Sequence, residues 1–388
     1  MVEKLLADVV IIGGGYFGAA AAYHLATKGF KTVLVEQGEV AGGASGGNFG
    51  RVQLQDAEPG LSLELSLAGW QRLLRLQEEL DIDIEFRRSG SLIVATNHQE
   101  WTELQEEQQK KIKAGLNIEL LEGREVTRRE PLLNGELVVG ASYSLEAQLN
   151  PFKLIYAFLN KAAAQGCEVL ENTPALGFEV ANGKIKEVIT SRGKIAAGTV
   201  VVAAGAWTRT LVKAVGLDLP IDFIWGEALV TEKAGPLLRN YFSLASFFAS
   251  EQSGADGYQV SLCCTCSTAG NLLVGETMTA GSPGELADEA GYRSRQENLP
   301  FLVQELARFF PALVSLKAIR SWRVPVACTR DHRPYLGFWG PENMLVAAGF
   351  KSSAIMTPIA GEIIAELVAG SCRFDLSEFK EARARWAN

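Results

Sequence analysis

A short glycine-rich stretch near the N-terminus constrains the fold of this chain more than any other feature. Residues Val9 to Ile12 are all β-branched, which is typical of a parallel strand buried on both faces. Gly13, Gly15 and Gly18 follow at G-x-G-x-x-G spacing and lead into an alanine-rich helix. This order of strand, tight turn and helix predicts a Rossmann-type α/β unit, in which the helix N-terminus faces a pyrophosphate.

The second strand of the predicted unit, KTVLVE, ends in a carboxylate. Glu36 lies eighteen residues after Gly18. A carboxylate in this position accepts hydrogen bonds from both hydroxyls of an adenosine ribose. Because the same charge disfavours a ribose 2′-phosphate, we expect a dinucleotide other than NADP.

The composition is that of a globular protein long enough for two domains. Of the 388 residues, 47% are hydrophobic and 21% are charged. The 37 basic and 45 acidic residues give a net charge of -8 without a basic run, so nucleic acid is not an expected partner. No apolar run reaches the length of a membrane span, and the N-terminal one is the first Rossmann strand. We expect a cytoplasmic protein, with peripheral association to a membrane left open.

The cysteines do not follow the spacing of a disulfide framework, so we expect them to be reduced. The CCTC cluster at 263–266 offers three thiols without a neighbouring histidine or second cysteine pair. On a strand, Cys264 and Cys266 would share one face and Cys263 the other. We therefore expect no metal site and interpret these cysteines as small buried apolar residues, although the sequence does not decide the role of the cluster.

Periodicity and turn residues outline the rest of the chain. The asparagine–glycine pair at 182–183 predicts a hairpin turn. The other expected elements are a helix over 59–80, a strand pair over 86–97, a charged surface helix over 98–115, a helix over 151–166, mostly strands with one long amphipathic helix over 223–319, and a strand, a glycine-led loop and a closing helix over 343–370.

Several segments occur in a familiar order along nearly the whole chain. After the glycine fingerprint come ASGGNFG, AQLNP, TVVVAAGAWT, TRDHRPYLG and LVAAGF with TPIAGEIIAEL. Together they resemble the D-amino-acid oxidase family of FAD enzymes, and most closely its glycine and sarcosine oxidase branch and the FAD subunits of proline, hydroxyproline and opine dehydrogenases. The resemblance implies a discontinuous Rossmann-type FAD-binding domain (1–80, 150–222 and 322–388) and an α+β substrate domain on an antiparallel sheet (81–149 and 223–321).

The same resemblance implies FAD as the cofactor, bound in an extended form. Sarcosine oxidases attach their flavin covalently to a cysteine. The resemblance aligns that cysteine with Val324 of this chain and not with Cys328. We therefore expect FAD to be bound noncovalently. The residues that the resemblance places at the cofactor are Gly13, Gly15, Tyr16, Phe17, Gly18, Glu36, Gln37, Ala44, Ser45, Asn48, Phe49, Gly50, Arg51, Ala175, Ala204, Gly205, Trp207, Gly349, Phe350, Lys351 and Ser352.

The implied activity is transfer of a hydride from the carbon that bears an amine to flavin N5, which gives an imine that water hydrolyses. The expected substrate is a small secondary amino acid or a related amine, such as an imino acid, an N-substituted amino acid, a D-amino acid or an opine. Two alternatives stay open: a flavin-dependent hydroxy-acid dehydrogenase, and a flavin-bearing subunit of a hetero-oligomer with little activity alone.

The candidate catalytic residues are Lys351, Arg51 and His332. Lys351, in AGFKSS, matches a lysine that the resemblance places before the last helix, and Arg51 matches a flavin-proximal arginine. His332 lies in TRDHRP, a segment that the family places near the flavin. The arginine that clamps the substrate carboxylate in relatives is replaced by Val326. Arg323 and Arg330 are alternatives for this contact.

The electron acceptor is left open among a partner subunit, a quinone and oxygen. Sarcosine oxidases carry a lysine that promotes the reaction with oxygen, and Leu273 stands in its place. This difference favours a dehydrogenase over an oxidase. A dehydrogenase must pass its electrons onward, so homo- and hetero-oligomeric assemblies both remain open.

Overall fold

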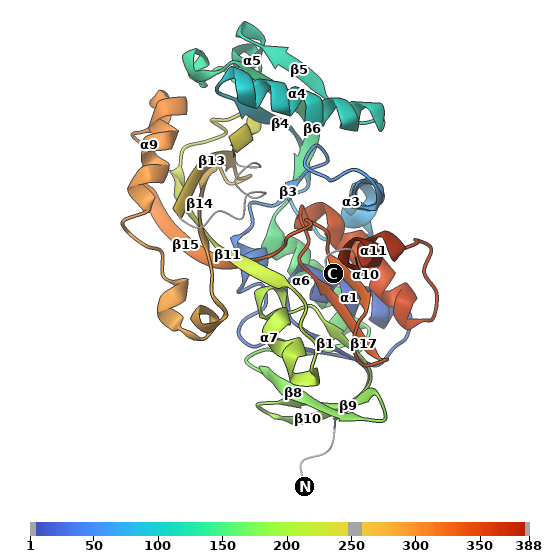
Figure 1. The fold of residues 1–388 in the computed structure, drawn as a ribbon. Coiled ribbons are helices and arrows are strands. Elements are labelled where there is room, and N and C mark those ends of the chain that lie inside the picture. The colour runs from blue at the N-terminus through green and yellow to red at the C-terminus, as the bar shows by residue number, and fades with distance from the viewer. Residues whose placement is uncertain (1–4, 247–257, 385–388) are drawn as a thin grey trace.

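The β-branched run at the N-terminus forms the centre of a mostly parallel sheet, the first sheet. The structure is a computed structural model that describes residues 5–246 and 258–384. The strands of this sheet are β1 (Leu5–Ile12), β2 (Thr32–Val35), β7 (Glu168–Leu170), β8 (Ala175–Ala181), β9 (Lys184–Thr190), β10 (Gly193–Val202), β16 (Tyr335–Phe338) and β17 (Met344–Ala348). Their order is β16-β17-β10-β1-β2-β7, with β9 and β8 continuing from β10. Figure 1 labels β1, β8, β9, β10 and β17 of this sheet. The predicted Rossmann-type unit is confirmed, because β1 runs parallel to both β2 and β10.

Helices cover one face of the first sheet, and a hairpin covers much of the other. The helices are α1 (Tyr16–Thr27), α3 (Leu61–Leu80), α6 (Pro151–Ala164) and α10 (Ser353–Val368), and they share one apolar core with β1. α1 is rich in alanine, and a Cβ on Gly361 of α10 would lie 2.7 Å from the Cβ of Ala20, so these two helices approach closely. The β8–β9 hairpin and α7 (Thr208–Val212) bury apolar side chains against the opposite face.

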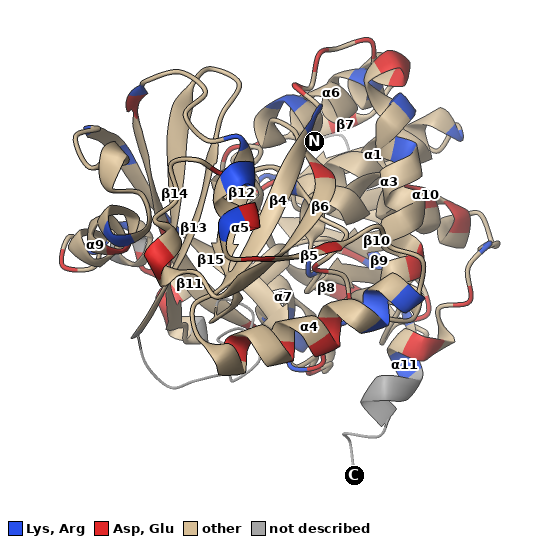
Figure 2. Ribbon diagram, turned by 90° about the horizontal axis from the view of Figure 1, so that it is seen from above, with Lys and Arg blue, Asp and Glu red and all other residues tan. Residues whose placement is uncertain are grey.

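A second sheet is antiparallel except where β12 runs parallel to β4. Its strands are β3 (Arg51–Val52), β4 (Arg87–Ala95), β5 (Glu119–Glu122), β6 (Gly140–Gln148), β11 (Ile221–Lys233), β12 (Asn240–Leu244), β13 (Tyr258–Cys266), β14 (Asn271–Ala280) and β15 (Ala318–Thr329), in the order β15-β11-β14-β13-β12-β4-β6-β3 with β5 on β6. The amphipathic helix α9 (Leu299–Phe309) packs Leu302, Leu306 and Phe309 against it. α4 (His98–Lys113) also packs on this sheet and carries both acidic and basic residues (Figure 2).

Most elements predicted from the sequence are confirmed. Asn182 and Gly183 join β8 to β9 with positive φ angles of 54° and 73°, as a two-residue hairpin turn requires. The strand pair predicted over 86–97 is wrong, because this segment forms the single strand β4. Gly90 does not turn the chain. Instead it allows a close approach, since a Cβ there would lie 2.0 Å from Asn240 Oδ1. The helix α11 (Ser377–Ala384), which follows α10, was not predicted.

The two sheets are connected by chain segments that cross between them. β3 follows directly from the glycine-rich loop of the Rossmann unit but pairs with β6 in the second sheet. β15 begins before residue 322 and also belongs to the second sheet. The domain boundaries expected from the sequence stay a prediction. Within the described ranges, no helix is long and apolar enough to cross a membrane. The remaining short helices include α2 (Ala44–Gly47) and α5 (Arg124–Arg129).

Candidate cofactor and substrate site

A large cavity connects the glycine-rich turn of the first sheet with the second sheet. Its volume is about 1410 Å³, which exceeds the roughly 300–1,000 Å³ of a typical small-molecule pocket. Strands β11, β13, β14 and β15 contribute to its wall. The predicted site residues that line it are Gly13, Gly15, Tyr16, Phe17, Glu36, Gln37, Ala44, Ser45, Asn48, Phe49, Arg51, Ala175, Ala204, Gly205, Trp207, His332, Gly349, Phe350, Lys351 and Ser352.

The glycine turn has no room for side chains. Gly13 has a φ of 110°, and a Cβ there would lie 2.4 Å from the carbonyl oxygen of Ala203. Two predicted cofactor residues, Gly18 and Gly50, do not line the cavity. A Cβ on Gly18 would lie 1.9 Å from the Gly13 carbonyl oxygen, so Gly18 allows α1 to pack against the turn. A Cβ on Gly50 would lie 1.8 Å from the carbonyl oxygen of Leu149.

The N-terminus of α1 fits an anionic group. The helix begins after Gly15, which provides no side-chain cap, and its first turn holds no acidic residue. The positive end of the helix dipole is therefore not neutralised by a carboxylate in that turn. Because both Gly13 and Gly15 line the cavity without side chains, a pyrophosphate can approach the backbone closely.

Glu36 lies at the end of β2 and lines the same cavity. Its two carboxylate oxygens accept hydrogen bonds from the backbone N–H of Gly14 at 2.7 Å and of Gly38 at 3.0 Å. These bonds fix the carboxylate next to the glycine turn. Each oxygen can accept a further bond, so the position fits the ribose contact expected from the sequence.

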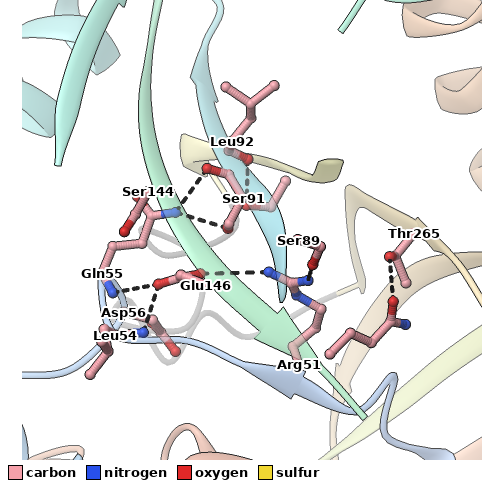
Figure 3. Close-up of polar contacts among 12 residues, drawn as sticks. Arg51, Leu54, Gln55, Asp56, Ser89, Ser91, Leu92, Ser144, Glu146 and Thr265 are labelled. Atoms are coloured by element: carbon pink, nitrogen blue, oxygen red, sulfur yellow. Dashed lines mark hydrogen bonds and ion pairs between the residues drawn. The ribbon is translucent and has the colours of Figure 1, made fainter. Parts of the chain in front are cut away.

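Arg51 is part of a buried charge cluster beside the cavity (Figure 3). It is only 6% exposed, and its Nη2 lies 3.5 Å from Glu146 Oε2. The other oxygen of Glu146 accepts hydrogen bonds from the backbone N–H of Leu54 at 2.6 Å and of Gln55 at 2.8 Å. Burial lowers the pKa of Arg51, and the charge of Glu146 opposes this effect. The glutamate thus supplies the counter-charge that keeps a guanidinium in the interior.

Two nitrogens of Arg51 are available to a ligand. Nε and Nη2 are buried and have no hydrogen-bond acceptor among the described residues, whereas Nη1 donates to Ser89 Oγ at 3.2 Å. The guanidinium also lies over the ring of Tyr241, 4.2 Å from its centroid. Because buried donors without acceptors are unfavourable, Nε and Nη2 fit a carbonyl, carboxylate or ring acceptor of a bound molecule.

Lys351 has two carboxylate neighbours that were not foreseen from the sequence. Its Nζ lies 3.0 Å from Glu58 Oε1 and 3.4 Å from Asp56 Oδ1, and Ser352 Oγ donates to Asp56 at 2.6 Å. Burial alone would raise the pKa of Asp56, but Lys351 and the Ser352 hydrogen bond hold this pKa below its usual value. The lysine charge is therefore already compensated, and its contact with substrate or flavin stays a prediction.

The other expected site residues separate into two groups. His332 and Arg330 line the cavity, whereas Arg323 does not. Burial, aided by the charge of Lys351, lowers the pKa of His332, which favours its neutral imidazole. Arg323 was held as an alternative substrate contact, and the structure contradicts this role. Its guanidinium is buried on the other side of β15 against Trp225, 3.4 Å from Glu227.

Sequence reasoning missed a polar group of the cavity on strands β12, β13 and β14. Tyr241, Gln259 and Glu276 all line it, and burial raises the pKa of Glu276 to about 7. The available signal was Glu276 itself, because it is the one charged residue of β14. Leu273, three residues before Glu276, does not line the cavity.

The alternation expected for the cysteine cluster is confirmed. Cys264 and Cys266 point into the apolar core of the second sheet, whereas Cys263 lines the cavity. The three thiols therefore do not converge on one point.

Comparison with known proteins identifies the family. A model of FAD-dependent oxidoreductases matches residues 8–367. The chain belongs to this family. Glycine oxidase of Bacillus licheniformis is 30% identical to this oxidoreductase over 376 residues, which cover 94% of this chain and 93% of the relative. Sarcosine oxidase subunit beta of Rhodobacter capsulatus is 24% identical, with 97% and 89% covered. The crystal structure of glycine oxidase from Geobacillus kaustophilus superposes with a TM-score of 0.85 at 26% identity, covering 97% of this chain and 98% of that one.

The cavity of the oxidoreductase fits FAD by its own geometry. The N-terminus of α1, whose first turn holds no acidic residue, suits the pyrophosphate, and the fixed carboxylate of Glu36 suits the adenosine ribose. Nε and Nη2 of Arg51, which have no hydrogen-bond acceptor among the described residues, lie toward the second sheet and suit polar atoms of the flavin or of a substrate beside it. The glycine turn, Glu36 and Arg51 all line this one cavity.

We expect acid precipitation of the oxidoreductase to release all of its flavin into the supernatant. Val324, at the position of the covalent attachment in relatives, cannot form a thioether, and it packs near Gly47 of α2. Cys328 also lines the cavity, so Cys328→Ser is the matched control. Flavin absorbance in the washed pellet of the wild type that disappears in Cys328→Ser would contradict noncovalent binding.

Proposed function

We propose that this oxidoreductase oxidises the carbon–nitrogen single bond of a small amine or amino acid to an imine, which water then hydrolyses. The observation that carries the proposal is one continuous cavity. It extends from the turn at Gly13 and Gly15 to the polar residues Tyr241, Gln259 and Glu276 on the second sheet. The relatives support the substrate class, since glycine oxidase and sarcosine oxidase are named for small amino acids.

FAD, when bound, supplies the acceptor for the hydride that leaves the substrate carbon. The contribution of the chain is to bind and orient the substrate and to control its protonation. Arg51 offers two unsatisfied donors to an acceptor group of the substrate or cofactor. Burial lowers the pKa of His332, and the neutral imidazole that this favours can accept a hydrogen bond from an N–H of the substrate amine.

The dehydrogenase assignment stays a prediction. It rests on Leu273 standing in the place of the oxygen-promoting lysine, and this residue does not line the cavity. A partner that accepts electrons is supported by the relative named as a beta subunit of sarcosine oxidase. Among residues 5–246 and 258–384, no feature favours a hydroxy acid over an amine as the substrate.

Anaerobic reduction of the purified holoenzyme tests the proposal. Amines, imino acids and N-substituted amino acids are each paired with the hydroxy acid of the same carbon skeleton, and the visible flavin spectrum is followed. We expect bleaching by members of the amine series only, with colour that stays lost in air and returns with an artificial electron acceptor. Bleaching by the hydroxy acids alone contradicts the amine assignment, and rapid recovery in air contradicts the dehydrogenase assignment.

A further inference from the structure

One part of the cavity carries a carboxylate next to an apolar residue. Glu276 of β14 and Val326 of β15 lie on either side of Gly226 of β11, and all three line the cavity. A Cβ on Gly226 would lie 3.2 Å from Glu276 Oε2 and 3.7 Å from Val326 Cγ2. The glutamate oxygen and the valine methyl group therefore both lie close to the space beside Gly226. We call these three residues the acidic pocket.

The carboxylate of the acidic pocket is isolated. Within residues 5–246 and 258–384, no hydrogen bond or ion pair of Glu276 is formed, and burial is the cause of its raised pKa. The buried cations nearby have acidic partners of their own: Arg51 with Glu146, and Lys351 with Asp56 and Glu58.

The third nearby cation, Arg323, lies on the opposite face of β15 and pairs with Glu227. It is therefore not available to the cavity. Glu276 is partly buried in the cavity wall, where a carboxylate without a cation is unfavourable, and a positively charged ligand reduces this penalty.

Val326 changes the charge that this pocket is expected to prefer, compared with a pocket that has an arginine at this position. The resemblance places an arginine that clamps the substrate carboxylate at the position of Val326. Here that position is apolar, and a carboxylate lies beside the same glycine as the valine methyl group. A substrate carboxylate in this pocket would meet like charge, whereas a cation would meet its counter-charge. The preference is therefore reversed relative to a carboxylate clamp.

The geometry points to Glu276 as the residue that binds a positively charged nitrogen group of the substrate, separate from the amine that is oxidised. The substrate class is then a diamine or a basic amino acid, carrying an ammonium or guanidinium group in addition to the reacting amine. This inference rests on the proposed function for the chemistry at the reacting amine. It assigns specificity to a residue outside the set predicted from the sequence.

Arginine and citrulline form the probe pair that tests this inference, because a guanidinium in one replaces a neutral ureido group of similar shape in the other. Both enantiomers and their N-methyl derivatives are added anaerobically to the wild-type holoenzyme and to Glu276→Gln, and the rate of flavin bleaching is measured against concentration. We expect the wild type to prefer arginine at least tenfold. Since a hydrogen bond to a charged group contributes about 1.5–3 kcal/mol, Glu276→Gln should lose about 10- to 100-fold on arginine and change little on citrulline.

Three outcomes would overturn the inference. The first is a wild type that prefers citrulline or does not discriminate. The second is an equal loss on both substrates in Glu276→Gln, which would place the residue in folding or in the chemical step. The third is a variant that keeps the wild-type preference. Lysine and norleucine repeat the comparison for an ammonium group.

A binding measurement separates failure of this inference from failure of the proposed function. If no amine bleaches the flavin, the proposed function fails, but n-propylguanidine and n-propylurea still report on the pocket by calorimetric titration. The wild type should bind n-propylguanidine about tenfold more tightly, and Glu276→Gln should bind both alike. Equal binding of the two probes by the wild type overturns the inference whatever the activity.

The preference for arginine over citrulline is expected to depend on pH. The pKa of Glu276 is raised to about 7, so this group is ionised above pH 7 and becomes neutral as the pH falls through 7. The preference for arginine should therefore decrease as the pH is lowered, and this decrease should be absent in Glu276→Gln. The reacting α-amine is common to both substrates, so its titration largely cancels in the ratio.

Other titratable groups that line the cavity are Arg51, Asp222, Tyr241, Cys263 and Cys328 of the second sheet and Tyr16, Glu36, Glu39, Asp56, Tyr292, Arg330, His332 and Lys351 elsewhere in its wall. Burial raises the pKa of Tyr241 well above its usual value, so this phenol stays neutral near pH 7. Any pH dependence of the ratio that survives in Glu276→Gln belongs to these groups. A wild-type ratio that does not change across pH 7 contradicts the role of Glu276.

Discussion

Replacement of Glu146 by alanine is expected to lower the free energy of unfolding by about 3–5 kcal/mol and to abolish flavin reduction by substrate. The substitution leaves the Arg51 guanidinium buried without its counter-charge, which is the most unfavourable way to break a buried ion pair. It also removes the acceptor of two backbone N–H groups, those of Leu54 and Gln55. The change in stability is measured by urea unfolding of the apoprotein, and flavin reduction by anaerobic titration.

Two further variants separate the charge of Glu146 from its hydrogen bonds. Glu146→Gln keeps an acceptor for both backbone groups and should therefore be less destabilising than Glu146→Ala. Glu119 and Arg129 form an exposed ion pair, in which the glutamate side chain is 47% and the arginine side chain 38% exposed. Glu119→Ala should therefore change the free energy of unfolding by less than about 1 kcal/mol. If Glu146→Ala and Glu119→Ala unfold at similar urea concentrations, the buried pair does not hold this part of the cavity together.

Gly13→Ala is expected to yield a protein that binds no FAD and unfolds at a markedly lower temperature. Gly13 has a φ of 110°, and its new Cβ would lie 2.4 Å from the carbonyl oxygen of Ala203. This contact is with backbone, so the turn between β1 and α1 must move away from the end of β10. The flavin-to-protein absorbance ratio after purification and the melting temperature with added FAD report the two effects.

Gly29→Ala provides the matched control for Gly13→Ala. Gly29 also has a positive φ, 84°, and lies in the same Rossmann unit at the end of α1, but nothing lies within 4 Å of its added Cβ. Only the conformational cost of about 1–2 kcal/mol is expected there, and FAD should be retained. Equal flavin content in the two variants would show that the close contact at Gly13 is not what matters for the cofactor.

The Rossmann unit could be predicted from sequence because its signals are local. The β-branched run, the glycine spacing and Glu36 all lie within about thirty residues, and each follows from the geometry of one turn. The hairpin at Asn182 and Gly183 was predictable for the same reason. Gly90 was misread because a glycine in a strand looks the same in sequence whether it ends the strand or admits a neighbouring side chain.

The polar partners inside the cavity could not be predicted, because they depend on the register of distant strands. Glu146 looks like an ordinary polar residue of an alternating strand, and it meets Arg51 only because β6 pairs with β3. The direction of Glu276 depends on a register shift between Glu227 and Ala228, where β11 pairs with β14. A single shift of this kind changes which side chains face the cavity.

The contact between Lys351 and the carboxylates of Asp56 and Glu58 also has a consequence for folding during synthesis. These partners are separated by almost three hundred residues, and the loop that carries Lys351 forms one wall of the cavity. Long-range closures of this kind are slow steps in folding. During synthesis, the glycine turn leaves the ribosome long before this wall exists. The nascent chain therefore has to keep an open and partly apolar surface out of other contacts until the segment that carries Lys351 has been translated.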